Sequence, residues 1–193
     1  MAQPPLLSRR GNFAGRHIFL RITRTASYSQ EGKNCVETMH ITEPATMITD
    51  YLLALASLVF GVSLMRLRAQ RPALSLTLWA IGFLASAIAA IVGGTFHGFA
   101  LYVSAPVHRA MWNLTVLLIG VSAGLFTAAI LAKSQGTPGQ KNWLVRGVML
   151  SMVGLVVQQS GLSLLRNFNH NDLYHCIQAI AFYGFFRAAR GLP

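Results

Sequence analysis

The sequence predicts an all-α protein, a polytopic bundle of about five transmembrane helices with its N-terminus outside the membrane and its C-terminus inside. Two observations indicate a membrane protein: only 11% of the 193 residues are charged, and the mean hydropathy is +0.49. Soluble domains average about 25% charged residues, so a soluble chain of this composition could not cover its own surface. The apolar residues also form continuous runs that do not alternate, which favours helices over barrel strands.

Each predicted helix is a run of mostly apolar residues, and a membrane span needs roughly 20 of them. The first four runs are TDYLLALASLVFGVSLM (49–65), ALSLTLWAIGFLASAIAAIVGGT (73–95), AMWNLTVLLIGVSAGLFTAAILA (110–132) and WLVRGVMLSMVGLVVQQSGLSL (143–164). The fifth run, DLYHCIQAIAFYGFF (172–186), is the shortest. Small residues spaced along these runs predict close helix contacts and would also permit oligomerisation. They are Gly94 with Gly98, Gly120 with Gly124, and Gly147 with Gly154 and Gly161.

The positive residues predict the orientation, because Lys and Arg collect on the cytoplasmic side of a membrane. Counted from His40 onward, one side of the bundle has eight positive residues and the other has two. The rich side comprises Arg66, Arg68, Arg71, Lys133, Lys141, Arg146, Arg187 and Arg190, and the poor side comprises Arg109 and Arg166. The net charge of +11 is therefore dispersed beside apolar runs. We interpret it as a topology signal and expect no nucleic-acid partner.

Residues 1–38 form a basic leader that opposes this orientation, because it contains five arginines and one lysine and its first acidic residue is Glu31. Three interpretations stay open. The leader is a start-site artefact with Met39 as the true first residue, a transit-like presequence, or a tail that binds anionic lipid. In each case we expect it to be disordered or poorly packed, with residues 39–193 forming the transmembrane domain.

Every predicted helix carries polar side chains toward the membrane face that the loop charges indicate as outer. Polar groups at this depth usually face the bundle interior or a water-filled cavity, so we expect a shared polar site. We expect Asp50 and Asp172 to be its catalytic groups, and His97, His170 and His175 to be metal ligands. Such ligands suit zinc in number and type. The other polar residues at this level are His108, Asn113, Gln158 and Gln159.

A structural interpretation of the same residues is also open. Asn169 or Asn171 can cap the last helix, with Asp172 in its first turn. The remaining polar groups can form hydrogen bonds between helices. At about 100° per residue, Asp172 and His175 share one face of this helix. We therefore regard these two as the first pair to test, and expect His97 to be their partner.

The segments FNHNDLYHCIQAIAFYGFFRAAR, TDYLLALASLVFG and GGTFHGF resemble a family of functionally uncharacterised bacterial multi-pass membrane proteins, over roughly residues 48–190. More remotely, the pattern is similar to the membrane hydrolase superfamily of alkaline ceramidases and progestin/adipoQ receptors. That resemblance implies a zinc ion held by three histidines, with His97 as the early ligand and His170 or His175 as the late ones. The chain has fewer predicted spans than that superfamily, and its late histidines have a different spacing.

These observations predict a multi-pass protein of the bacterial inner (cytoplasmic) membrane with membrane lipid as its partner. The first functional hypothesis is a metal-dependent hydrolase that acts on a lipid at the outer leaflet. The alternatives are a small transporter or receptor subunit, and a structural membrane protein whose polar cluster only packs helices. Enzymatic activity is therefore an open question at the level of sequence.

Overall fold

Five helices form the domain, and their sequential neighbours run antiparallel. A computed structural model of the chain describes residues 40–132, 136–161 and 168–191. The predicted leader, residues 1–38, lies outside these described residues. The helices are α1 (Pro44–Gln70), α2 (Leu74–Gly98), α3 (Ala105–Leu131), α4 (Pro138–Ser160) and α5 (His170–Arg190). Each coincides with one of the predicted runs, so the all-α class is confirmed.

The helix starts fall into two groups. Helices α1 and α3 begin with a proline in the first turn and without a side-chain cap, a position where the missing N–H costs nothing. Helix α2 also begins without a side-chain cap. Helices α4 and α5 form the second group, which begins with reciprocal capping boxes, formed by Thr137 with Gln140 and by Asn169 with Asp172; α4 has a proline in its first turn as well. These boxes satisfy amides that have no partner inside the helix. The predicted capping role of Asn169 is therefore confirmed.

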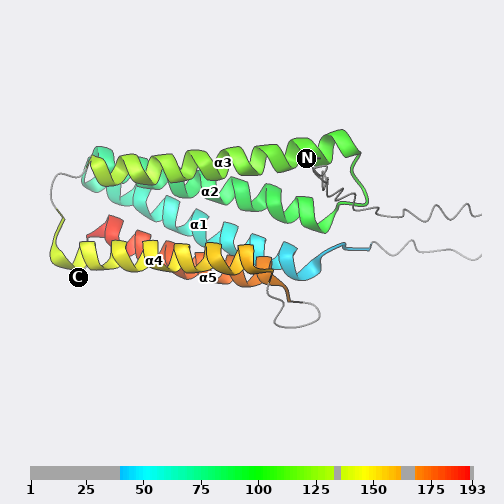
Figure 1. Cartoon of the computed structure of the whole chain (residues 1–193). Coiled ribbons are helices and arrows are strands. Elements are labelled where there is room, and N and C mark those ends of the chain that lie inside the picture. Colours follow the sequence, from blue (N-terminus) through cyan, green and yellow to red (C-terminus); the bar gives the residue numbers. More distant parts are fainter. Residues whose placement is uncertain (1–39, 133–135, 162–167, 192–193) are drawn as a thin grey trace, which may run out of the picture. The chain divides into compact units, whose positions relative to one another are not determined.

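The helices pack in the spatial order α3, α2, α1, α5, α4 (Figure 1). Helix α1 thus lies between α2 and α5, and it provides most of the contact between the α1–α3 group and the α4–α5 hairpin. The N-terminal ends of α1, α3 and α5 and the C-terminal ends of α2 and α4 lie together. We call this end of the helices the polar end, because it contains the predicted polar residues.

The opposite half of the domain is filled by aromatic rings. Phe83 is fully buried, and its ring lies 5.6 Å from that of Phe60, 4.9 Å from that of Phe126 and 5.6 Å from that of Phe182. Such offset and edge-on pairs bury large apolar surfaces in specific geometry. We call this set the aromatic cluster; its members are Phe60, Trp79, Phe83, Phe126, Phe182, Phe185 and Phe186. It joins α1, α2, α3 and α5 away from the polar end.

Two of the predicted glycine contacts form as expected. Gly94 and Gly98 face α1, and Gly147 and Gly154 face α5. Gly120 and Gly124 make no such contact with the described part of the chain, because a Cβ at either position would meet no described atom within 4 Å. Oligomerisation through that open face of α3 stays a prediction. Gly161 makes no such contact with the described residues either, and it ends α4 in the left-handed region with φ of 68°, where glycine is the favoured residue.

Among the described residues, three helices are long and apolar enough to cross a membrane, namely α1, α2 and α3. Helices α4 and α5 are less apolar, because they contain charged and amide side chains. Large apolar side chains are exposed along α1, α3 and α4, as is normal for surfaces that contact lipid rather than water. The chain is thus a membrane protein by length and composition of its helices. The orientation of the helices across the membrane, which we predicted from the positive residues of the loops, stays a prediction.

Candidate functional site

A carboxylate–imidazole pair lies at the centre of the polar end. Oδ1 of Asp50 in α1 is 3.3 Å from Nε2 of His175 in α5, and the two side chains are only 7% and 11% exposed. A buried charge is costly unless it is paired and hydrogen-bonded. Each of these groups therefore needs the other, and the contact fixes the approach of α1 to α5.

The second nitrogen of the same imidazole is also engaged. Nδ1 of His175 lies 3.2 Å from Oγ1 of Thr49, and this hydroxyl donates to the Thr46 carbonyl at 3.0 Å. With its hydrogen used in that bond, Thr49 can only accept from an Nδ1–H of His175. One proton is then left to be shared between Nε2 and Asp50. If the pair loses that proton, the one hydrogen left on the imidazole can move from Nδ1 to Nε2, where it faces Asp50, and the Thr49 hydroxyl then has to turn and donate to Nδ1.

Glycines of α2 allow Asp50 to occupy this position. A Cβ at Gly94 would lie 3.0 Å from Cβ of Asp50 and 2.8 Å from Cε1 of Tyr51, closer than real Cβ atoms approach. A Cβ at Gly93 would lie 3.4 Å from Oδ2 of Asp50. Tyr51 is held in turn by its hydroxyl, 3.1 Å from Oγ1 of Thr95. The consecutive glycines thus let α1 and α2 approach closely beside the carboxylate, as small residues do in membrane helices.

Asp172 is completely buried beside the pair. Its Oδ2 accepts a 2.7 Å hydrogen bond from the backbone N–H of Asn169, as part of the capping box. Its Oδ1 has no hydrogen-bond partner among the described residues. Asp172 is close enough to interact electrostatically with both Asp50 and His175. It therefore has a structural role with one oxygen and leaves the other unused.

The other two predicted metal ligands, His97 and His170, lie in the last turn of α2 and the first turn of α5. Nδ1 of His97 lies 3.0 Å from Oε2 of Glu43, so its hydrogen-bonded partner is this glutamate rather than Asp172 or His175. It still interacts electrostatically with His175. His170 is the first residue of α5. Within the ranges that the structure describes, no group of three or more His, Cys, Asp and Glu side chains could hold a metal ion.

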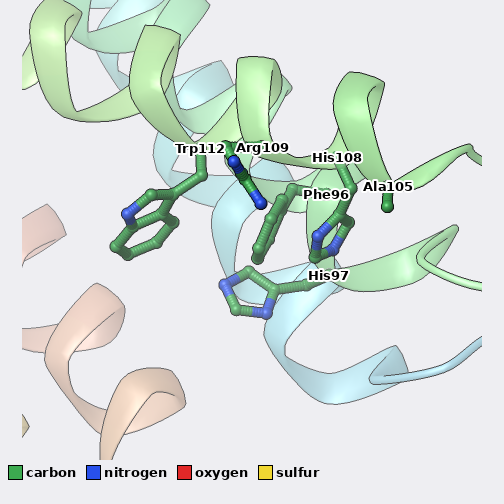
Figure 2. A pocket seen from close by; sticks show the side chains of 6 residues that line it. All are labelled: Phe96, His97, Ala105, His108, Arg109 and Trp112. Atoms are coloured by element: carbon green, nitrogen blue, oxygen red, sulfur yellow. The ribbon is translucent and has the colours of Figure 1, made fainter.

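A pocket of about 620 Å³ opens beside His97, between the end of α2 and the start of α3 (Figure 2). His108 stacks on Phe96 with ring centroids 3.8 Å apart, and Trp112 lies 5.5 Å from the same ring. The lining residues are Phe96, His97, Ala105, His108, Arg109 and Trp112. The pocket is thus aromatic on its walls and basic in its charged groups, and it borders the polar site through His97.

Sequence reasoning found Asp50, Asp172 and His175 but missed three of their neighbours. Thr49 precedes Asp50 directly, and a second polar residue at the start of an apolar run was a usable signal. Glu43 is the N-cap residue of α1, seven residues before Asp50, and its pairing with His97 depends on how α1 and α2 align. Gly94 was predicted only as a packing residue together with Gly98, and Gly93 was not singled out, because no pattern along one helix shows which side chain of a neighbour fills the space.

The comparisons with known proteins give one result. The sequence signature of a family of unknown function, DUF6962, matches residues 45–145 and 125–193. Neither the curated proteins nor the solved structures include a significant match to the chain. The remote resemblance to alkaline ceramidases and progestin/adipoQ receptors thus gains no support. The matched ranges extend over α1 to α5 and include every residue of the polar site except Glu43, and the chain belongs to this family of unknown function, DUF6962.

Proposed function

We propose that the protein is a membrane-embedded hydrolase in which Asp50 and His175 form an acid–base centre for an amphiphilic substrate. The observation that supports this proposal is the 3.3 Å contact between the Asp50 carboxylate and the His175 imidazole in nearly solvent-free surroundings. A base that is oriented by a second group is the arrangement by which enzymes activate water or a hydroxyl group. The position of the pair near the helix ends supports access from one membrane face.

The chemistry follows from the two imidazole nitrogens. Asp50 would orient His175 through Nε2–H, which leaves Nδ1 without a hydrogen and able to act as the base. The Thr49 hydroxyl, 3.2 Å from Nδ1, would turn away and the attacking water would take its place. His175 would take a proton from water at this position as the water oxygen attacks the ester carbon. It would return that proton to the alkoxide as the bond between carbon and the leaving oxygen breaks. The unused Oδ1 of Asp172 offers a further acceptor for the water or the substrate.

A metal ion is not needed for this sequence of steps. A catalytic zinc ion usually has three protein ligands and an open position. Asp50 and His175 would supply two of them, and His97 is bonded to Glu43 instead. Metal analysis of protein purified without chelator is the direct test of the predicted zinc, and a content near one ion per chain would add a Lewis acid to the proposal.

A second candidate function is structural. Both nitrogens of His175 are engaged, and other buried polar side chains also pair between helices, as Ser86 does with Ser122 at 2.6 Å and Gln178 with Ser151 at 3.2 Å. These pairs support the interpretation of the polar cluster as a set of interhelical hydrogen bonds. A transporter gains less support, because the aromatic cluster fills the half of the domain opposite the polar end.

Lipid analysis separates the two candidates. Wild-type protein, Asp50→Asn and His175→Gln would be incubated in vesicles of phosphatidylethanolamine and phosphatidylglycerol, and products measured by mass spectrometry. We expect the wild type to release fatty acid or headgroup and both variants to release about 100-fold less while staying folded. Ser86→Ala is the matched control, because it removes an interhelical hydrogen bond elsewhere. It should lose stability and keep activity. No product from the wild type, or full activity of His175→Gln, would overturn the proposal.

We further infer the membrane and the face at which this centre operates. The loop charges support the bacterial inner membrane, with the polar end in the outer leaflet. The described loop at this end, between α2 and α3, contains no Lys or Arg, whereas the α1–α2 loop at the opposite end begins at Arg71, next to Arg68 in the last turn of α1. The substrate would then be a lipid of the outer leaflet.

A further inference from the structure

The pocket beside the polar site is built largely by one face of α3. Ala105, His108, Arg109 and Trp112 are three or four residues apart in sequence, so they share one side of the helix. The wall opposite is formed by Phe96 and His97 from the last turn of α2 (Figure 2). A volume of about 620 Å³ is within the range of small-ligand sites.

Ring contacts hold the pocket in shape. Phe96 stacks on His108 at 3.8 Å, lies 5.5 Å from Trp112, and meets the edge of His97 at 5.1 Å. Three of the lining side chains are therefore fixed against one phenyl ring. Trp112 is still 48% exposed. An aromatic ring in this state, at the end of a membrane helix, is suited to the boundary between headgroups and acyl chains.

The charge of the pocket favours an anion. No acidic residue lines the pocket. Of the described acidic residues, Asp50 pairs with His175 and Asp172 caps α5, while Glu43 pairs with the lining residue His97. Arg109 has no ion-pair partner in the described ranges, and its side chain is exposed at the pocket. The first turn of α3, from which Ala105 and His108 point, has no side-chain cap. The positive end of the helix dipole therefore adds to the charge of Arg109.

We propose that this pocket binds the phosphate group of a phospholipid headgroup. Arg109 would hold the phosphate through its planar pair of N–H groups, a geometry that matches phosphate oxygens. His108 would donate a further hydrogen bond, and Trp112 would contact the start of the acyl chains. This inference deepens the proposed function, because it names a phosphate-containing lipid as the substrate class. It rests on the proposed function for the link between this pocket and His175.

Calorimetric titration of the full chain in detergent tests the binding step alone. The probes are short-chain dihexanoyl phosphatidylglycerol, dihexanoylglycerol without phosphate, and inorganic phosphate. We expect saturable binding of the phospholipid, and a loss of about tenfold or more in affinity for Arg109→Gln. Arg109→Lys keeps the positive charge but not the planar guanidinium group, so its affinity for the phospholipid should lie between those of the wild type and Arg109→Gln. Arg68→Gln is the matched control, since it removes an exposed arginine at the opposite end of α1.

The outcomes separate the phosphate site from the reaction. Affinity within about twofold of wild type for both Arg68→Gln and His175→Gln would support a headgroup site distinct from the acid–base centre. Loss of turnover in His175→Gln with normal binding would support the proposed function separately. Equal binding of dihexanoylglycerol, or equal losses in Arg109→Gln and Arg68→Gln, would overturn the headgroup site. Inorganic phosphate that binds as tightly as the phospholipid would assign the pocket to the free anion and overturn the lipid as its source.

Discussion

Oδ1 of Asp50 in α1 lies 3.3 Å from Nε2 of His175 in α5. Most of the contact between the α1–α3 group and the α4–α5 hairpin is made by these two helices. The contacts of the His175 imidazole with Asp50 and with Thr49 therefore join the two groups of helices at their polar end. Any change in the protonation or geometry of these groups acts directly on that junction.

The pair should be energetically coupled. We expect Asp50→Asn and His175→Gln each to lower the free energy of unfolding, and the double variant to lose about 1 kcal/mol less than the sum, as found for hydrogen bonds between membrane helices. A double-mutant cycle in mixed detergent micelles measures this. Losses that add within about 0.5 kcal/mol would show that the two groups act independently.

The Thr49 hydroxyl should contribute through His175 rather than through its own helix. Thr49→Val removes the partner of Nδ1, 3.2 Å away, and we expect a loss of about 1 kcal/mol in unfolding free energy. Thr127→Val is the control, because the Thr127 hydroxyl donates only to the Ala123 carbonyl of the same helix, at 2.9 Å. The control should change stability by less than about 0.5 kcal/mol. Equal effects of the two substitutions would contradict the role of Thr49.

Gly94 should not tolerate a side chain. A methyl group there would lie 2.8 Å from the Tyr51 ring and 3.0 Å from Cβ of Asp50. Gly94→Ala should therefore push α1 away and cost about 1–3 kcal/mol, as overpacking does. Gly120→Ala meets no described atom within 4 Å and should be neutral or stabilising by up to about 1 kcal/mol, because alanine favours helix. The measurement is the melting temperature of each variant, as a monomer in detergent. Equal melting temperatures of the two variants would contradict the close approach of α1 to α2 at Gly94.

Topology is open to chemical labelling. In a background without Cys35 and Cys176, we introduce Ser104→Cys at the polar end and Gln70→Cys at the opposite end of the helices. A membrane-impermeant maleimide should label the first in intact cells and the second only after lysis, if the polar end faces outside as the loop charges predict. The reverse pattern would place the polar site in the cytoplasmic leaflet.

Much of the fold follows from properties of single helices. Runs of apolar residues located all five helices, and Asn169 was one of the two asparagines that the sequence offered as the cap of α5. Partners between helices were harder to predict, because rotation and depth of one helix against another are set by packing along its whole length. His97 shows this: Glu43 lies close enough to bond it at 3.0 Å only because the segment before α1 lies beside the end of α2, where Thr42 donates to the Gly98 carbonyl.

The two kinds of helix start have a consequence for how the protein is made. Helices α4 and α5 close their own first turns with capping boxes, and they pack tightly through Gly147 and Gly184. Such a hairpin can form as a unit at the membrane surface, since each capping box satisfies amides in the first turn of its helix. The more apolar α1, α2 and α3 would enter the bilayer first during synthesis. The hairpin would follow as a unit, and the meeting of His175 with Asp50 would be the last step of assembly.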